Sequence, residues 1–326
     1  MKKIILLISF YCFTVQLLAQ DKNLFKIANE YYRNGDFEKS IIIYKQLEKE
    51  NININSIYNY YLESLIKLEY FSEAEKLVKR ANNKHPKNLK YKVDLGYLWK
   101  VNNLVKKAEK EFQKIINNLP PGQYNQVNSL ASSFKYRREY EWALKTYKKG
   151  QDLNPQHSFR LQIANIYRNL GETELMVDEL ILLVKEDPKK RQSVQNTLQN
   201  TLGRTKGNGD NFEILKNHLL KEVQKTNNTD LTEMLVWLFM QQDEFGAAFI
   251  YSKALDKRLN ETGYRMYELA AIAHENEAYN TAIAAYEYLV EKGNPTYLLE
   301  ARILRVIAMS EQTLASTHNK NDLKKI

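Results

Sequence analysis

The chain has 326 residues, of which 48 are Lys or Arg and 39 are Asp or Glu, so its formal net charge is +9. Its 11 glycines and 6 prolines are too few for a turn-rich β fold and favour helices. A single compact core stops growing at roughly 250 to 300 residues, whereas a stack of helical repeats has no such limit.

The first twenty residues have the order of a secretory signal peptide. Two lysines precede the mostly apolar run 4–18, which ends at Ala19-Gln20. A membrane anchor is the alternative, but this run is shorter than the about 20 apolar residues that cross a bilayer. We expect cleavage after residue 20, which would remove Cys12, the single cysteine. The short signal ending in Leu18-Ala19-Gln20 and the composition rich in Asn, Lys and Ile suggest a bacterial protein, which we expect in the periplasm or attached to the outer membrane.

Residues 21–188 contain an internal repeat. Small residues stand at Ser40, Ala74, Ala108 and Ala143, which are 34, 34 and 35 positions apart. Bulky residues lie nine positions before each (Tyr31, Leu65, Trp99, Phe134) and four positions after each (Tyr44, Val78, Phe112, Tyr147). Prolines follow three of the units, and a fifth unit contains Ala164, Tyr167, Leu180 and Pro188. This spacing predicts five helix pairs, four of them closed by a proline, which cannot continue a helix.

These positions resemble the tetratricopeptide repeat family. The likeness is most specific at Gly35-Asp36-Phe37, at Leu95-Gly96 with Trp99, and at Tyr140-Glu141-Trp142-Ala143 with Tyr147. It implies an all-α fold, a right-handed α-solenoid of helix-turn-helix repeats. The sequence departs from the family pattern at Leu62 and Met176, where a small residue is usual.

The rest of the chain divides into three further regions. The pattern fades over 189–229, where we predict a degenerate helix pair containing the glycine-rich loop 203–211 and a second helix over 212–224. Two better units follow over 230–295. In the final region, 296–326, we predict a helix over 297–313 that covers the apolar face of the last repeat. A polar tail follows this helix. The same helix could equally begin a further repeat.

No motif in the sequence predicts catalysis, a cofactor or a metal site. Gly207-Asn208-Gly209 lacks the lysine and hydroxyl residue of a phosphate-binding loop. His274-Glu275 resembles the start of a zinc-protease motif, but Ala278 stands where the second histidine would be. We therefore expect a protein that is not an enzyme.

The resemblance to tetratricopeptide repeats implies that a partner binds along the concave stripe formed by the first helices. Mapped by register, this stripe contains Asn29, Tyr32, Arg33, Lys67, Tyr97, Lys100, Asn128, Lys135, Tyr136, Asn165, Arg168 and Asn169, with Glu63 beside them. Such cations, amides and tyrosines suit a protein partner with an acidic segment or a chain terminus. We expect a non-catalytic interaction scaffold or adaptor in the cell envelope.

The alternative is a basic solenoid that binds nucleic acid, an anionic polymer or an anionic lipid surface. Its support is the sequence pI near 9.2 and the clusters Arg137-Arg138, Lys148-Lys149 and 189–191. Acidic residues are interleaved with these clusters, and export would take the protein away from nucleic acid. A basic surface of this kind could also bind the anionic headgroups of a membrane. We expect no membrane-spanning helix in the mature chain.

Overall fold

The computed structural model describes residues 23–49, 54–202 and 209–323. The predicted signal peptide and most of the predicted glycine-rich loop lie outside the described residues. The chain divides into two compact units, Met1–Phe159 and Arg160–Ile326, and each is described by itself.

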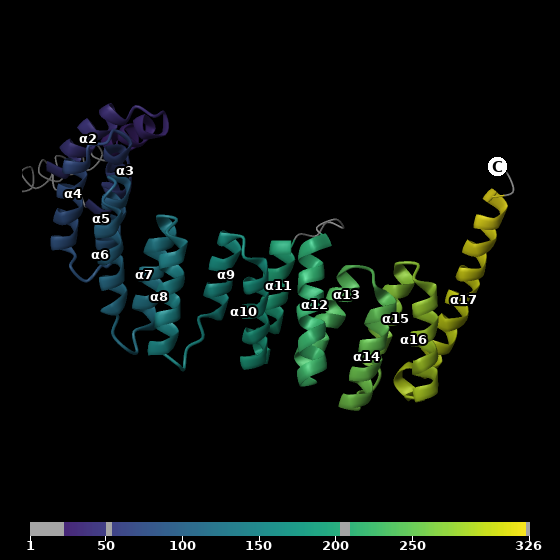
Figure 1. Cartoon of the computed structure of the whole chain (residues 1–326). Helices are drawn as coiled ribbons and strands as arrows, with labels where there is room; N and C mark the ends of the chain where they lie inside the picture. Colours follow the sequence, from purple (N-terminus) through teal and green to yellow (C-terminus); the bar gives the residue numbers. More distant parts are fainter. Residues whose placement is uncertain (1–22, 50–53, 203–208, 324–326) are drawn as a thin grey trace, which may run out of the picture. The chain divides into compact units, whose positions relative to one another are not determined.

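All the secondary structure in the described residues is helical, which confirms the predicted all-α solenoid of helix pairs (Figure 1). The first unit contains a helix over 23–33, then α2 (Phe37–Lys49), α3 (Ile54–Lys67), α4 (Phe71–Lys84), α5 (Lys90–Val101), α6 (Val105–Asn117), α7 (Tyr124–Tyr136) and α8 (Tyr140–Leu153). The second contains α9 (Arg160–Leu170), α10 (Thr173–Glu186), the short η1 (Pro188–Lys190), α11 (Arg191–Leu202), α12 (Gly209–Thr226), α13 (Thr229–Gln241), α14 (Phe245–Leu259), α15 (Tyr264–Glu275), α16 (Tyr279–Lys292) and α17 (Pro295–Leu323).

The turn between the two helices of a pair repeats one backbone motif along the chain. In the turns of this kind that the structure describes, one residue has a positive φ: Gly35, Glu69, Asn103, Arg138, Gly171, Asp243 and Glu277. The next residue donates its backbone N–H to the carbonyl five positions earlier, at Tyr31, Leu65, Trp99, Phe134, Tyr167, Phe239 and Ala273. This is the Schellman ending, which satisfies the last carbonyls of the first helix. The bulky residues of the sequence repeat therefore mark the last turn of each first helix.

The small residues of the repeat lie in the interior of the protein. Ser40, Ala74, Ala108 and Ala143 are all fully buried. At Gly96, a Cβ atom would lie only 2.3 Å from Cε1 of Phe112 on the partner helix. Gly96 is therefore required by the close approach of α5 and α6, with the Phe112 ring filling the space beside it.

Two predicted boundaries differ from the structure. Helix α12 begins at Gly209, so the last three residues of the predicted loop are helical, and the predicted helix 212–224 lies inside it. Helix α17 continues to Leu323 and does not end at residue 313. Residues 314–323 contain neither glycine nor proline, so nothing in this segment stops the helix and the predicted polar tail is largely helical. None of the helices within the described residues combines the length and the apolar composition that a membrane span requires.

Candidate partner-binding pocket in the first unit

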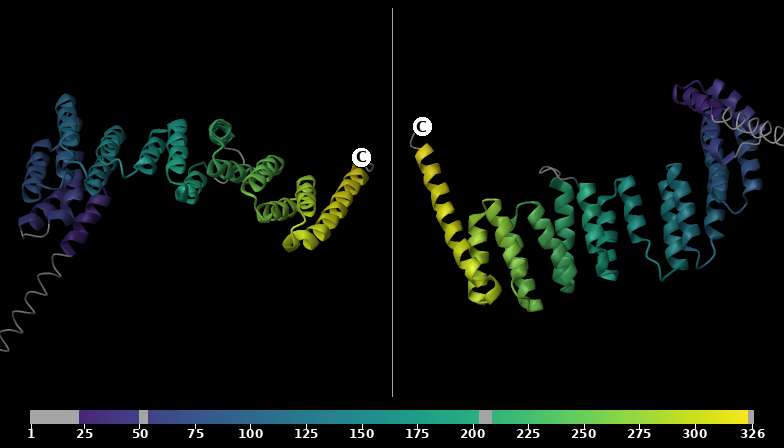
Figure 2. Two further views of the ribbon diagram at one scale, coloured as in Figure 1. Left: turned by 90° about the horizontal axis from the view of Figure 1, so that it is seen from below. Right: turned by 180° about the vertical axis from the view of Figure 1, so that it is seen from behind.

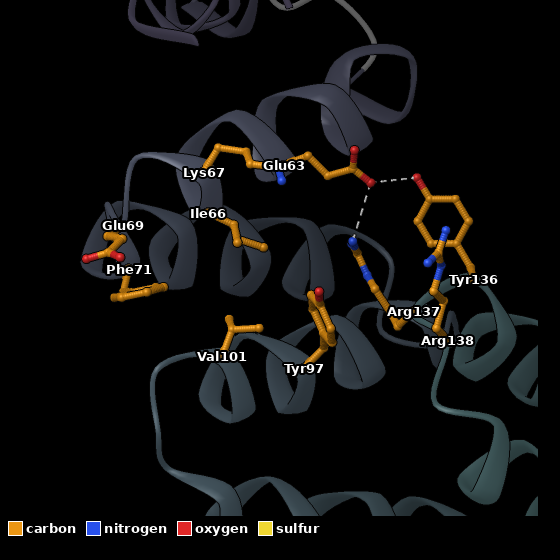
Figure 3. Close-up of a pocket in the computed structure, with 10 residues that line it drawn as sticks. All are labelled: Glu63, Ile66, Lys67, Glu69, Phe71, Tyr97, Val101, Tyr136, Arg137 and Arg138. Atoms are coloured by element: carbon orange, nitrogen blue, oxygen red, sulfur yellow. Dashed lines mark hydrogen bonds and ion pairs between the residues drawn. The ribbon is translucent and has the colours of Figure 1, made fainter. Parts of the chain in front are cut away.

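The first unit carries a pocket of about 420 Å3 formed by helices α3, α4 and α5 and the turn that joins α7 to α8 (Figure 3). Its lining residues are Glu63, Ile66, Lys67, Glu69, Phe71, Tyr97, Val101, Tyr136, Arg137 and Arg138. First helices and their turns supply most of this lining because successive repeats place equivalent positions side by side. The lining combines an apolar wall with cations and carboxylates at its rim.

Arg137 is buried at one side of this pocket and joins three helices. Its Nε atom donates to Oδ1 of Asp94 over 2.6 Å, and its Nη1 atom lies 3.6 Å from Oε1 of Glu63. The guanidinium carbon lies 5.0 Å from the ring centroids of both Tyr97 and Tyr136. Burial by itself would lower the pKa of Arg137, but the charge and hydrogen bond of Asp94 raise it overall. Arg137 is therefore a permanently charged structural residue.

Glu63 organises the upper rim of the pocket. The hydroxyl of Tyr32 donates to Oε2 of Glu63 over 2.5 Å. The hydroxyl of Tyr136 donates to Oε1 of Glu63 over 3.0 Å (Figure 3). Burial and the nearby carboxylate raise the pKa of Tyr136 to about 12. Both tyrosines therefore stay neutral donors at physiological pH, and the carboxylate of Glu63 is largely satisfied within the chain.

Two cations at the pocket remain exposed. Lys67 ends α3 and Arg138 occupies the positive-φ position of the α7–α8 turn. Neither forms an ion pair with another described residue. The same pocket has an apolar wall that includes Ile66, Phe71 and Val101, each only partly exposed. This arrangement can accept an anionic group and an adjacent apolar group from another molecule.

Of the twelve predicted site residues, Lys67, Tyr97 and Tyr136 line this pocket, and Tyr32 is joined to it through Glu63. Four others of the predicted set are held by contacts of their own. Asn29 accepts from the Tyr44 hydroxyl at 2.7 Å, Lys100 donates to Glu139 at 2.8 Å, Asn128 donates to the Tyr124 carbonyl at 3.2 Å, and Asn165 donates to the Leu161 carbonyl at 2.9 Å. Arg33 is exposed and Lys135 is half-buried.

Three of the predicted residues belong to the second unit and are not part of this pocket. The side-chain amides of Asn165 and Asn169 both bond to the backbone of α9 itself. The amide of Asn169 donates to the Asn165 carbonyl at 2.7 Å. Arg168 is exposed on the same helix. The pocket thus gathers a subset of the predicted stripe.

The sequence pattern did not predict that Arg137 and Asp94 form a buried ion pair. Arg137 was interpreted as one member of a basic cluster that could meet phosphate, yet its side chain is only 4% exposed. Asp94 has an exposed side-chain fraction of 1% and also accepts from the Tyr58 hydroxyl at 2.9 Å. An acidic residue among the apolar positions of α5 was the available signal, because a buried carboxylate requires a partner.

The described residues contain no cluster of His, Cys, Asp and Glu that could hold a metal ion. His274, which begins the incomplete zinc motif, instead lies 2.7 Å from Glu311 of α17 through its Nε2 atom. This contact links α15 to the last helix.

The chain is similar to several solved structures of other proteins. No family model matches the chain, and no curated protein matches it significantly. A chain of the Naa15/Naa10 complex bound to HypK-THB is 17% identical, with a TM-score of 0.30, and the match covers 84% of this chain but only 42% of that one. The P58(IPK) TPR domain is 12% identical, with a TM-score of 0.26 and coverage of 90% and 99%.

A third similar structure is the C-terminal part of a TPR repeat-containing protein from Cytophaga hutchinsonii. It is 15% identical, with a TM-score of 0.28, and the match covers 85% of this chain and 98% of that chain. Likeness at this level transfers no activity or partner. The assignment of tetratricopeptide-type pairs rests on the chain's own repeat spacing and turn geometry.

Proposed function

We propose that this chain, an all-α solenoid of tetratricopeptide-type helix pairs, is a protein-binding scaffold whose first unit captures a partner segment. The segment we infer places an acidic side chain beside a large apolar one. Lys67 and Arg138, two exposed cations that line the same pocket as an apolar wall, carry this proposal. A carboxylate beside either cation would gain charge-assisted hydrogen bonds, while the apolar side chain would enter the pocket.

The charge distribution of the first unit supports an acidic partner. Its described residues, 23–49 and 54–159, include 24 Lys and Arg but only 14 Asp and Glu. The described residues of the second unit, 160–202 and 209–323, include 17 Lys and Arg and 23 Asp and Glu. A positive potential over the first unit would attract an acidic segment and raise its rate of association.

The test is a selection of random displayed peptides on the purified protein. We expect the enriched peptides to pair Asp or Glu with a large apolar residue, and to lose binding to a Lys67→Glu/Arg138→Glu variant. The matched control is Lys106→Glu/Lys110→Glu, which makes the same charge change on the exposed side of α6. Equal binding to the two double variants would place the binding surface outside this pocket.

Binding to nucleic acid or another anionic polymer is the second candidate, because the surplus of cations in the first unit would also suit phosphates. The burial of Arg137 and its pairing with Asp94 remove one residue from the basic clusters that favour it. A duplex DNA probe should therefore bind more weakly than the selected peptides at moderate salt. Tighter binding of the DNA would reverse the order of the two candidates.

Export to the bacterial envelope, either the periplasm or the outer membrane, is part of the proposal. It is supported by the lysines and apolar run of residues 1–20. Mass spectrometry of the protein recovered from envelope fractions should show a chain that begins at Asp21. Recovery of the uncleaved chain of 38.4 kDa from the cytoplasm would contradict export.

A further inference from the structure

The last helix, α17, exposes an apolar face. Its exposed large apolar residues are Leu299 (70%), Ile303 (53%), Val306 (58%), Ile307 (40%), Met309 (48%) and Leu314 (60%). The other exposed large apolar residues of the described chain occur singly or in pairs on different elements. Soluble monomers rarely leave so many large aliphatic side chains together in water.

The spacing of these residues places them on the side of α17 that faces away from the stack. Leu299, Ile303 and Val306 follow one another at intervals of four and three, which keeps them on one side of a helix. Ala301 and Ala308, on the other side, are fully buried. Figures 1 and 2 show α17 lying beside α16 and reaching beyond it, and α17 is 29 residues long whereas α16 has 14.

The charged residues near this face mostly have partners within the same chain. Arg305 lies 3.4 Å from Glu287, and Glu311 lies 2.7 Å from His274. Glu300 accepts from the hydroxyl of Tyr267 at 2.6 Å. Arg302, three residues after Leu299 and four before Val306, is exposed on this face, so covering the face brings one such cation per copy into the contact.

We propose that a second copy of this chain covers this face, with α17 packed against α17. The described chain has no second apolar patch of comparable size, so a head-to-tail contact between copies would have no matching surface. A two-fold contact needs only one patch, because the same surface serves both copies.

The size of the face agrees with such a contact. It runs over residues 299–314, about 22 Å at the rise of an α-helix. Six aliphatic side chains that are about half exposed present on the order of 500 Å2 per copy, and two copies reach the roughly 1,000 Å2 of a specific interface. A dimer would carry two copies of the first-unit pocket, which would strengthen the capture of a partner with repeated binding segments. The α17 contact itself does not depend on the function proposed for the pocket.

Sedimentation velocity of the full chain over a range of concentrations tests this contact. We expect a reversible monomer–dimer equilibrium, which an Ile303→Glu/Val306→Glu variant weakens at least tenfold while its circular dichroism stays unchanged. The matched control is Ile42→Glu/Ile250→Glu, because these isoleucines are 67% and 65% exposed but lie on α2 and α14. Dimerisation of the control should equal that of the natural chain.

Disulfide trapping locates the contact. In a Cys12→Ser background, single cysteines at Leu299, Val306 and Ser310 should produce an oxidised dimer at one position or more, because residues near a two-fold axis meet their own copies. A cysteine at Ile250 should produce none. A natural chain that stays monomeric at all concentrations would overturn the proposal and assign the face to a different protein. Dimers that survive the α17 substitutions, or that never cross-link through α17, would overturn it as well.

Discussion

Arg137 and Asp94 are 43 residues apart in the sequence, yet a 2.6 Å hydrogen bond joins the Nε atom of one to the Oδ1 atom of the other. Their side chains are 4% and 1% exposed. The pair ties the turn after α7 to the middle of α5, so it couples neighbouring repeats and holds one side of the pocket in place.

Replacing Arg137 by Met should lower the free energy of unfolding by about 3 to 5 kcal/mol, because the buried carboxylate of Asp94 would keep only the more distant Lys90, at 3.9 Å, as a cationic partner. Urea unfolding followed by circular dichroism measures this change. Arg138→Met is the control: its side chain is exposed, so its effect should stay within about 0.5 kcal/mol. Equal effects of the two substitutions would contradict the structural role of the Arg137–Asp94 pair.

Gly96→Ala should destabilise the protein by about 1 to 3 kcal/mol, because the new Cβ atom would press on the Phe112 ring. Gly246, in the first turn of α14, provides the opposite case, since the nearest atom to an added Cβ lies 4.0 Å away. Gly246→Ala should stabilise by about 0.5 to 1 kcal/mol through lower backbone entropy in the unfolded chain. Thermal unfolding of both variants checks the prediction, and a stabilising Gly96→Ala would show that α5 and α6 are not in this close contact.

Glu277→Gly should raise the free energy of unfolding by about 1 kcal/mol. Glu277 has a φ of 59° in the α15–α16 turn, a conformation that is costly for residues with a Cβ atom and free of that cost for glycine. Glu275→Gly, two residues earlier at the end of α15, should instead destabilise by a few tenths to about 1 kcal/mol. Chemical unfolding of the two variants should therefore shift in opposite directions, and a shared direction would count against the proposed turn motif.

Alkaline pH should unfold the protein as its tyrosines ionise. Burial raises the pKa values of Tyr136 and Tyr286 from 10.0 to about 12. Because the folded values are higher, the stability that these groups contribute is fully present below pH 10 and is lost as the pH rises towards 12. Ultraviolet absorbance should show part of the tyrosines ionising only in this range, together with a loss of helicity. Ionisation of all tyrosines near pH 10 without loss of helicity would contradict the prediction.

The pocket could be anticipated from the sequence only in part. Lys67, Tyr97 and Tyr136 were predicted because the repeat register assigns them to exposed positions of first helices. Lys100 satisfies the same rule, but in the structure it donates to Glu139 of the next repeat. A register identifies the side of a helix on which a residue lies, and it contains no information on which charged neighbour is within reach.

The sequence by itself determined the helix pairs of this protein, because their signals are local. The small residue at Ala74 or Ala108, the bulky residue at the end of the first helix and the αL turn position all recur within one repeat of about 34 residues. The tertiary structure alone decided that Arg137 is buried against Asp94 and that the apolar face of α17 remains exposed. Both depend on how neighbouring repeats stack, since a side chain meets a partner one repeat away only after the helices between them have packed.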